Sequence, residues 1–93
     1  MKYKLAYTTS FRRAYRQIVK RGYDVTRLRA VVDTLQRGEK PDARYRDHAL
    51  TGEFVGYREC HIRPDWLLVY KKDNDKLILT LIDTGTHADL FGL

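Results

Sequence analysis

Hydrophobic and polar residues alternate at the start of the chain and then change to a helical spacing. In residues 2–7, Tyr3, Leu5 and Tyr7 lie on one side, which is the pattern of a short, half-buried strand. Hydroxyl residues at 8–10 can then cap a helix in which apolar residues recur every three or four positions between basic ones. This amphipathic basic helix should end near Gly22, and its apolar positions are Phe11, Tyr15, Ile18 and Val19.

A second helix is predicted directly after the first. Asp24 can cap its start, and Gly38 followed by Pro41 marks its end. Because the turn between the two helices is short, we expect them to pair antiparallel. The apolar positions of the second helix are Val25, Leu28, Val31, Val32 and Leu35.

The second half of the chain has the pattern of a meander. Residues 40–52 combine proline, glycine and mixed charges without a sustained period, so we interpret them as a loop. Three segments rich in aromatic and β-branched residues follow at 54–62, 66–71 and 76–82, joined by the short turns typical of antiparallel neighbours. Thr84 or Thr86 can cap a final helical turn before Gly92.

These elements predict an α+β fold. We expect an N-terminal strand, two antiparallel helices packed on one face of a mainly antiparallel four-stranded sheet, and a short C-terminal helical turn. The length of 93 residues predicts a single domain, 1–93. The other sheet face is left for functional side chains.

The sequence also predicts where the chain acts. Its longest apolar run, residues 66–70, has five residues, whereas a membrane span needs about 20. The N-terminal residues lack the apolar stretch of a secretory signal. We therefore expect a cytoplasmic protein with no membrane association.

Charge is divided unevenly between the two halves. Residues 1–46 carry 13 Lys+Arg and 4 Asp+Glu, a balance of +9, whereas residues 47–93 carry 5 and 8, a balance of −3. Such one-sided basic charge is typical of proteins that bind nucleic acid or another polyanion. A solvated helix face and a surface for an acidic protein partner remain open as alternatives. The helix-borne cations are Arg12, Arg13, Arg16, Lys20, Arg27 and Arg29.

Candidate acid–base groups lie in the second half, where all three histidines are found, at His48, His61 and His87. An imidazole has an ordinary pKa of about 6.5 and exchanges protons near neutrality. Alternation along the strand predicted at 54–62 places Glu59 and His61 on one face and Cys60 on the other. The single cysteine is therefore interpreted as a small buried residue and not as a nucleophile.

A metal site is considered as well. His61, Asp65 and His87 are ligand types for a transition metal, but their spacing lacks the tight pattern of two histidines one helical turn apart. We expect no metal and no cofactor.

Longer motifs resemble a known family. Residues 56–70 read GYRECHIRPDWLLVY, residues 84–91 read TGTHADLF, and DHAL stands upstream at 47–50. In this order they resemble the YafQ branch of the RelE-type bacterial toxins over essentially the whole chain. The resemblance implies a RelE-like fold and a ribosome-dependent mRNA endonuclease. It also implies that an acidic cognate antitoxin, encoded beside the toxin, neutralises it.

The resemblance also implies roles for single residues. RNA cleavage without metal needs a base for the attacking 2′-OH and an acid for the departing 5′-oxygen. We assign the acid to His87 and the base to His61, with Asp65 near it, while His48 shares the base's role or orients the phosphate. Two aromatic residues either stack on bases or pack in the core, and the basic helix residues contact ribosomal RNA. The aromatic pair is Trp66 and Phe91.

One position departs from the family pattern. The family has an arginine that contacts the scissile phosphate directly before the TGTH motif, and this chain has Asp83. Either this is a deliberate inactivating change, or the chain has diverged and another cation supplies the charge. The candidates for that cation are Arg63, Arg58 and Lys71. A noncatalytic module that binds RNA or the antitoxin is therefore the alternative function.

Overall fold

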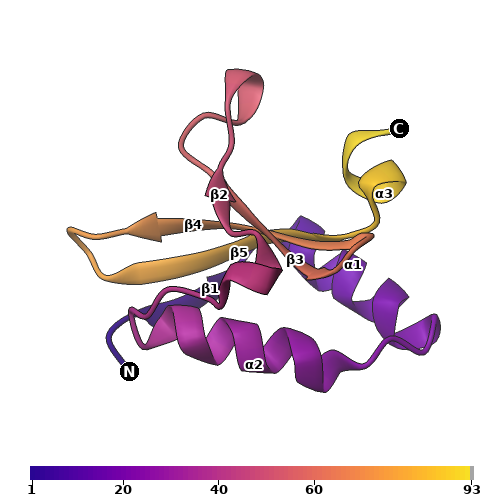
Figure 1. The fold of residues 1–93 in the computed structure, drawn as a ribbon, viewed down its shortest axis with the longest axis horizontal. Helices are drawn as coiled ribbons and strands as arrows, with labels where there is room; N and C mark the ends of the chain where they lie inside the picture. Colours follow the sequence, from indigo (N-terminus) through magenta and orange to yellow (C-terminus); the bar gives the residue numbers. More distant parts are fainter. Residues whose placement is uncertain (93) are drawn as a thin grey trace.

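A five-stranded sheet forms the centre of the molecule, in a computed structural model that describes residues 1–92. Its strand order is β1-β5-β4-β3-β2, and both long helices cover one face (Figure 1). β1 (Lys4–Tyr7) runs parallel to β5 (Ile78–Gly85), and all other neighbours are antiparallel. The remaining strands are β2 (His48–Ala49), β3 (Arg58–Arg63) and β4 (Trp66–Asp73). The predicted α+β class is confirmed.

Both predicted helices begin at the predicted caps. α1 (Thr9–Lys20) follows Thr8, whose hydroxyl oxygen accepts a hydrogen bond from a first-turn N–H. α2 (Val25–Gln36) follows Asp24, whose carboxylate does the same. These caps satisfy N–H groups that have no partner within the helix. No helix within residues 1–92 combines the length and the apolar character that crossing a membrane requires.

The core lies between the helices and one face of the sheet. α2 buries the predicted line at Leu28, Val31, Val32 and Leu35. α1 buries only Phe11 and Ile18, whereas Val19 is 50% exposed, so its assignment to the apolar face is wrong. The sheet contributes Cys60, Ile62, Trp66, Leu68, Tyr70, Leu79 and Leu81. Because strand side chains alternate, Glu59 and His61 point to the face that α1 and α2 leave uncovered.

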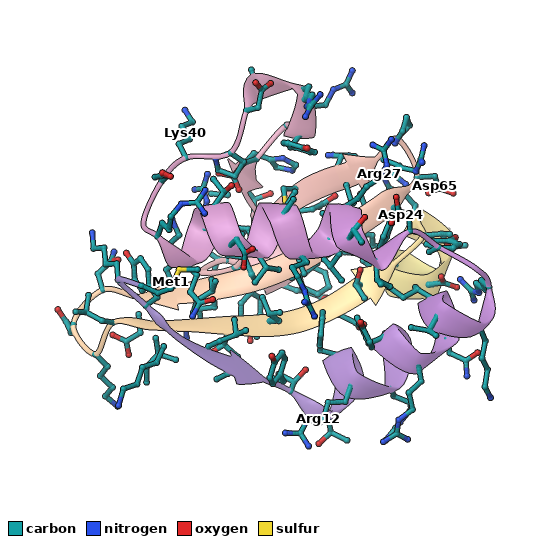
Figure 2. All side chains as sticks on the ribbon, turned by 90° about the horizontal axis from the view of Figure 1, so that it is seen from below. Met1, Arg12, Asp24, Arg27, Lys40 and Asp65 are labelled. Atoms are coloured by element: carbon teal, nitrogen blue, oxygen red, sulfur yellow. The ribbon has the colours of Figure 1, made fainter. Side chains whose placement is uncertain are left out.

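The two helices pair less closely than predicted. They diverge from the turn at Gly22, and a groove of about 740 Å³ lined by both helices and β1 lies between them (Figure 2). The reason is that α1 packs along β5 while α2 packs against β3, so the width of β4 separates their supports.

The region interpreted as a loop contains β2, the strand that the sequence did not predict. In that loop, β2 pairs with β3 through the partners His48↔Glu59 and Ala49↔Arg58. Two short 3-10 turns flank β2, at Ala43–Tyr45 and Gly52–Phe54. A strand of two residues leaves no periodic pattern, which is why the sequence predicts only four strands.

Element boundaries also differ from the prediction, because the strand predicted at 66–71 extends to Asp73 and the strand predicted at 76–82 spans Ile78–Gly85. The strand predicted from residue 54 begins at Arg58, because the preceding residues form the second 3-10 turn. Thr84 belongs to β5, and the cap of α3 (His87–Phe91) is Thr86, which forms a capping box with Asp89.

Candidate active site

Three imidazole rings meet on the sheet face opposite α1 and α2. His48 of β2 and His61 of β3 are stacked with ring centroids 6.1 Å apart, and the centroids of His61 and His87 are 5.9 Å apart. His87 is the first residue of α3, which follows directly from β5. Three elements that are distant in the sequence thus bring the predicted histidines together.

A buried carboxylate lies between two of the rings. Glu59 is 5% exposed, and its two oxygens lie 3.8 Å from Nε2 of His48 and 3.9 Å from Nε2 of His61. The β2–β3 register places His48 directly opposite Glu59, and His61 follows two residues later on the same face. A buried negative charge therefore lies close to both rings. The motifs indicated the position of Glu59 but no role for it.

His61 is the least exposed of the three histidines. Burial is the largest influence on its pKa and lowers it below the ordinary value, and the other two rings and Arg46 lower it further. Glu59 opposes this shift without reversing it. Nδ1 of His61 is buried and has no hydrogen-bond partner within residues 1–92. An imidazole with a lowered pKa is neutral near pH 7, so His61 can accept a proton.

Asp65 orients His87. Its Oδ1 accepts two hydrogen bonds from that residue, from the backbone N–H at 2.9 Å and from ring Nδ1 at 2.6 Å. These hydrogen bonds lower the pKa of Asp65, so the carboxylate stays ionised. An ionised carboxylate can only accept hydrogen bonds, so Nδ1 of His87 must carry a proton. Nε2 of His87 is then the nitrogen that can exchange a proton with the substrate. This arrangement orients the ring of His87 for proton transfer at Nε2.

An ion pair fixes the segment that carries His48. The buried carboxylate of Asp47 accepts a hydrogen bond from Nη2 of Arg58 at 2.7 Å and another from the hydroxyl of Tyr70. Burial and then the bond to Asp47 raise the pKa of Tyr70, so its hydroxyl remains a donor. Nδ1 of His48 lies 2.7 Å from the carbonyl oxygen of Arg46.

A second ion pair holds α3 against α1. Arg21 donates two hydrogen bonds to the carboxylate of Asp89, at 2.7 and 3.3 Å. Oδ2 of Asp89 also accepts from the N–H of Thr86 at 2.9 Å. These contacts, that of Arg21 first, lower the pKa of Asp89 to about 2. A Cβ at Gly85 would lie 2.8 Å from this carboxylate, so a glycine is needed there.

Trp66 lies in the core and not on a binding surface. It is 2% exposed, its Nε1 donates to Oγ1 of Thr84 at 3.0 Å, and its ring meets the ring of Tyr23 edge-on. A base cannot stack on a ring enclosed in this way. Of the two roles open for Trp66, core packing is the one that the structure supports.

Phe91 contacts a residue that the sequence did not indicate. Its ring meets that of Phe54 edge-on, with centroids 5.5 Å apart. Phe54 is 39% exposed and belongs to the 3-10 turn that follows β2. The contact connects that turn with α3 on the face of the sheet that carries the histidines. The sequence around Phe54 contains no pattern that would have predicted this contact.

Asp83 lies apart from the histidines. It is opposite Val69 of β4, and its Oδ1 accepts a hydrogen bond from the N–H of Thr84 at 2.9 Å. The half-buried side chain lines a cavity of about 320 Å³ with basic residues of α1 and with Asp89. Burial raises the pKa of Asp83, against the hydrogen bond from Thr84. Within residues 1–92 no hydrogen bond or ion pair joins Asp83 to a histidine.

The six helix-borne cations are all exposed. Arg12, Arg16 and Arg29 line the groove between the helices, and Figure 2 shows Arg12 at the outer end of α1. Arg27 instead lines a cavity beside His61. The other two are Arg13 and Lys20 of α1.

Part of the cluster has the spacing of a metal site. Glu59, His61 and His87 each offer one ligand atom, and these atoms lie within 4.8 Å of one another. Imidazole and carboxylate are suitable ligands for a transition metal. The set differs from the one considered from the sequence, because Asp65 bonds to His87 and Glu59 takes its place.

The fold and the cluster define a class: a small basic α+β protein with a histidine–carboxylate site on an open sheet face. The family model described as a bacterial toxin of type II toxin-antitoxin systems, YafQ, matches residues 3–92. The chain belongs to this YafQ toxin family.

Individual relatives resemble the chain over nearly its whole length. The mRNA interferase toxin YafQ of Escherichia coli K12 is 39% identical over 89 residues, which are 95% of each chain. The crystal structure of YafQ from E. coli BL21(DE3) has a TM-score of 0.90 at 34% identity and covers 97% of this chain and 99% of its own. In the E. coli DinJ-YafQ toxin-antitoxin complex, the matching chain has a TM-score of 0.89 at 33% identity, with 99% and 100% covered.

Proposed function

We propose that this chain is an mRNA interferase toxin of a type II toxin-antitoxin system, an endoribonuclease that cleaves message on the ribosome in the cytoplasm. Family membership and the named activity of the E. coli relatives support the class of activity. The observation that carries the chemistry is the cluster in which His61 has a lowered pKa and His87 is held by Asp65. A neutral imidazole and a second imidazole oriented by a carboxylate supply the base and the acid of the proposed reaction.

The proposed reaction is an attack of the 2′-OH on the adjacent phosphate. His61 removes the hydroxyl proton, the new P–O bond forms, and the bond to the 5′-oxygen breaks. His87 gives its Nε2 proton to that oxygen while Asp65 keeps the ring oriented. His48, paired with buried Glu59, offsets charge on the phosphate or shares the role of the base. The products are a 2′,3′-cyclic phosphate and a 5′-hydroxyl, and no cofactor is consumed.

Ribosome binding is assigned to the basic helices. Exposed cations of α1 and α2, such as Arg13 and Arg29, would contact phosphates of ribosomal RNA without reading sequence. Ribosome affinity should therefore fall steeply between low and high ionic strength. An affinity that does not change with salt would contradict this assignment.

The second proposed partner is an acidic antitoxin. The E. coli YafQ in the matching complex is bound to DinJ, and this chain has the basic surface that an acidic segment would cover. Such a segment would fold as it binds. The product of the adjacent gene should bind the purified chain, and a lack of affinity would contradict the partnership.

Asp83 favours a second candidate function, a noncatalytic module that binds RNA or the antitoxin. A carboxylate replaces the phosphate-binding cation of the family in an otherwise complete site. Expression in growing cells without antitoxin distinguishes the two functions, because an active interferase arrests growth and a binding module is tolerated. The biochemical test is cleavage of a labelled message with and without ribosomes, where cleavage only with ribosomes supports the interferase.

A further inference from the structure

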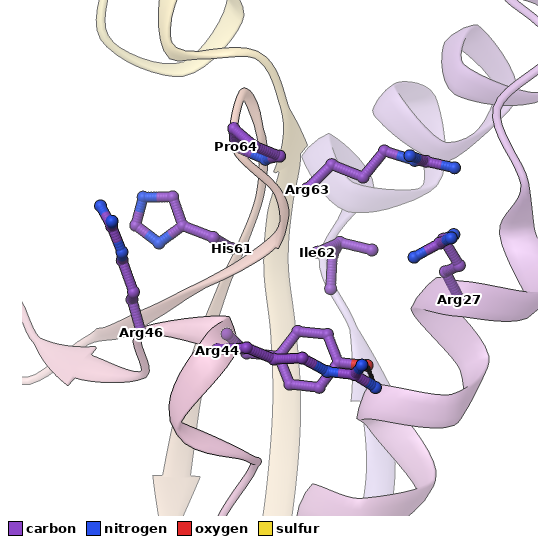
Figure 3. Close-up of a pocket in the computed structure, with 8 residues that line it drawn as sticks. Arg27, Arg44, Arg46, His61, Ile62, Arg63 and Pro64 are labelled. Atoms are coloured by element: carbon purple, nitrogen blue, oxygen red, sulfur yellow. Dashed lines mark hydrogen bonds between the residues drawn. The ribbon is translucent and has the colours of Figure 1, made fainter.

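Four arginines surround a small cavity next to the candidate base. The cavity has a volume of about 260 Å³, and Figure 3 shows its lining. The arginines come from three separate elements: α2, the Ala43–Tyr45 turn with its C-cap, and the end of β3. We call it the arginine pocket; its lining residues are Arg27, Arg44, Tyr45, Arg46, His61, Ile62, Arg63 and Pro64.

The arginine pocket lacks a neutralising acid. No acidic residue lines it, and none of its four arginines forms a salt bridge within residues 1–92. Asp24 is close enough for Arg27 and Arg63 to lower its pKa, but its carboxylate caps α2 through Thr26. Arg44 lies over the ring of Tyr45, with 4.9 Å between the guanidinium carbon and the ring centroid. Four like charges gathered around one cavity attract an anion.

The pocket shares a wall with the candidate active site. His61 lines it, and Figure 3 shows Arg46 beside the imidazole ring. The charge of Arg46 contributes to the lowered pKa of His61. The backbone of Arg46 has φ +50°, a left-handed conformation that is unusual for a residue with a side chain. The energetically unfavourable backbone conformation of Arg46 thus holds its guanidinium next to His61, the candidate base.

We propose that the arginine pocket binds a backbone phosphate of the RNA next to the scissile phosphate. This inference rests on the proposed function, because it assumes an RNA strand at His61. A strand whose scissile phosphate contacts His61 must continue past one side of that ring, and the pocket forms one of those sides. Guanidinium groups match phosphate with forked pairs of donors, and the small, polar pocket suits a phosphate better than a base.

The pocket also identifies which substitute cation is available. Of the three candidates considered for position 83, Arg58 is bonded to Asp47, and Lys71 lies 5.9 Å from the ring of Tyr57. Arg63 alone of the three lines the arginine pocket. A phosphate contact of Arg63 would add binding affinity for RNA. Because the arginine pocket lies on the side of His61 away from β5, Arg63 would not replace a cation at position 83, which belongs to β5.

The test measures RNA affinity separately from cleavage. The probe is a short fluorescent RNA with 2′-O-methyl groups, which cannot be cleaved by attack of a 2′-OH. Fluorescence anisotropy gives its affinity across a salt series for the full chain and for the double variant Arg44→Gln/Arg63→Gln. Both residues are exposed, and circular dichroism checks that the variant folds.

The expected result is a loss of affinity with a smaller salt dependence. Loss of a charge-assisted contact weakens binding by at least about tenfold, and loss of one phosphate contact reduces the slope of log affinity against log salt by about 0.7. The matched control is Lys72→Gln/Lys76→Gln, which removes the same charge from the β4–β5 hairpin. Its affinity should change by less than about threefold. Arg44→Lys/Arg63→Lys should keep the slope but lose part of the affinity, because lysine lacks the fork.

Three outcomes separate the pocket from the proposed function. Equal losses in the pocket variant and the lysine control would overturn the phosphate site. Unchanged RNA affinity with lost binding to the acidic antitoxin would also overturn it, because the pocket would then serve a protein carboxylate. A pocket-specific loss of RNA affinity supports the site even if the chain cleaves no message, a result that would refute only the proposed function.

Discussion

The substitution Asp83→Arg should increase message cleavage by at least about a hundredfold. Asp83 is opposite Val69, and Val69 is opposite Glu59, so the three residues form one row across the sheet. Two strand spacings of about 4.8 Å place position 83 about 10 Å from Glu59, beside which the rings of His48 and His61 lie. An arginine needs to cross only the strand that carries Val69 to reach a phosphate held there.

The size of the effect follows from the charge and the distance. At about 10 Å and an effective dielectric constant of about 20, two unit charges interact by about 1.7 kcal/mol. Replacing repulsion by attraction changes the transition-state energy by about 3 kcal/mol, which corresponds to about two orders of magnitude in rate. A forked hydrogen bond to the phosphate adds to this value, and solvent at the half-buried position reduces it. Loss of a comparable preorganised contact typically costs about 10²–10³ in rate.

The assay compares both proteins on ribosomes programmed with the same labelled message. Asp83→Asn separates the two contributions, because it removes the repulsion without adding a donor fork, and it should recover only part of the gain. Antitoxin affinity should be the same for all three proteins. Equal and robust cleavage by the unsubstituted chain and by Asp83→Arg would refute the placement of residue 83 beside the scissile phosphate.

Three further predictions concern pH, stability and thiol chemistry. The ascending limb of the pH profile of kcat/KM should reflect deprotonation of His61, whose lowered pKa places that limb below about pH 6.5; a limb above this value would contradict its role as the base. Asp89→Asn should lower the free energy of unfolding at pH 7 by at most about 1 kcal/mol, because the ion pair is solvent-screened. Since the folded-state pKa of Asp89 is lowered to about 2, this contribution is complete above its unfolded value and disappears as pH falls through about 2; urea titrations at pH 7 and pH 2 check it. Cys60 is fully buried with a raised pKa, so a thiol reagent should modify it only as fast as the protein unfolds, and rapid labelling of the native protein would be inconsistent with its burial.

The parts of the fold that follow from periodicity were predictable. Asp24 and the apolar line of α2 carry a helix signal that needs no tertiary information. The alternation that separates Glu59 from Cys60 likewise predicts the functional and core faces of β3. The two residues of β2 carry no such signal, because their strand exists only through pairing with β3.

The candidate site was predictable in its proposed acid–base groups but not in their surroundings. The motifs identify His61 and His87, since acid–base chemistry needs those residue types. They do not show that Glu59 lies between two rings, which depends on the β2–β3 register. The arginine pocket depends on the meeting of α2, a 3-10 turn and the end of β3, so no local pattern indicates it. Trp66 shows that a residue within a family motif need not belong to the site, because its aromatic ring lies in the core.

Analysis of the cleavage products tests the proposed chemistry most directly. The unsubstituted chain and Asp83→Arg are incubated with programmed ribosomes, and the ends of the fragments are determined. A second message carries a single 2′-deoxynucleotide at the mapped cleavage position. We expect 2′,3′-cyclic phosphate and 5′-hydroxyl ends, at least from Asp83→Arg, and no cleavage at the deoxynucleotide. Ends with a 3′-hydroxyl and a 5′-phosphate, or cleavage that persists at the deoxynucleotide, would contradict attack by the 2′-OH.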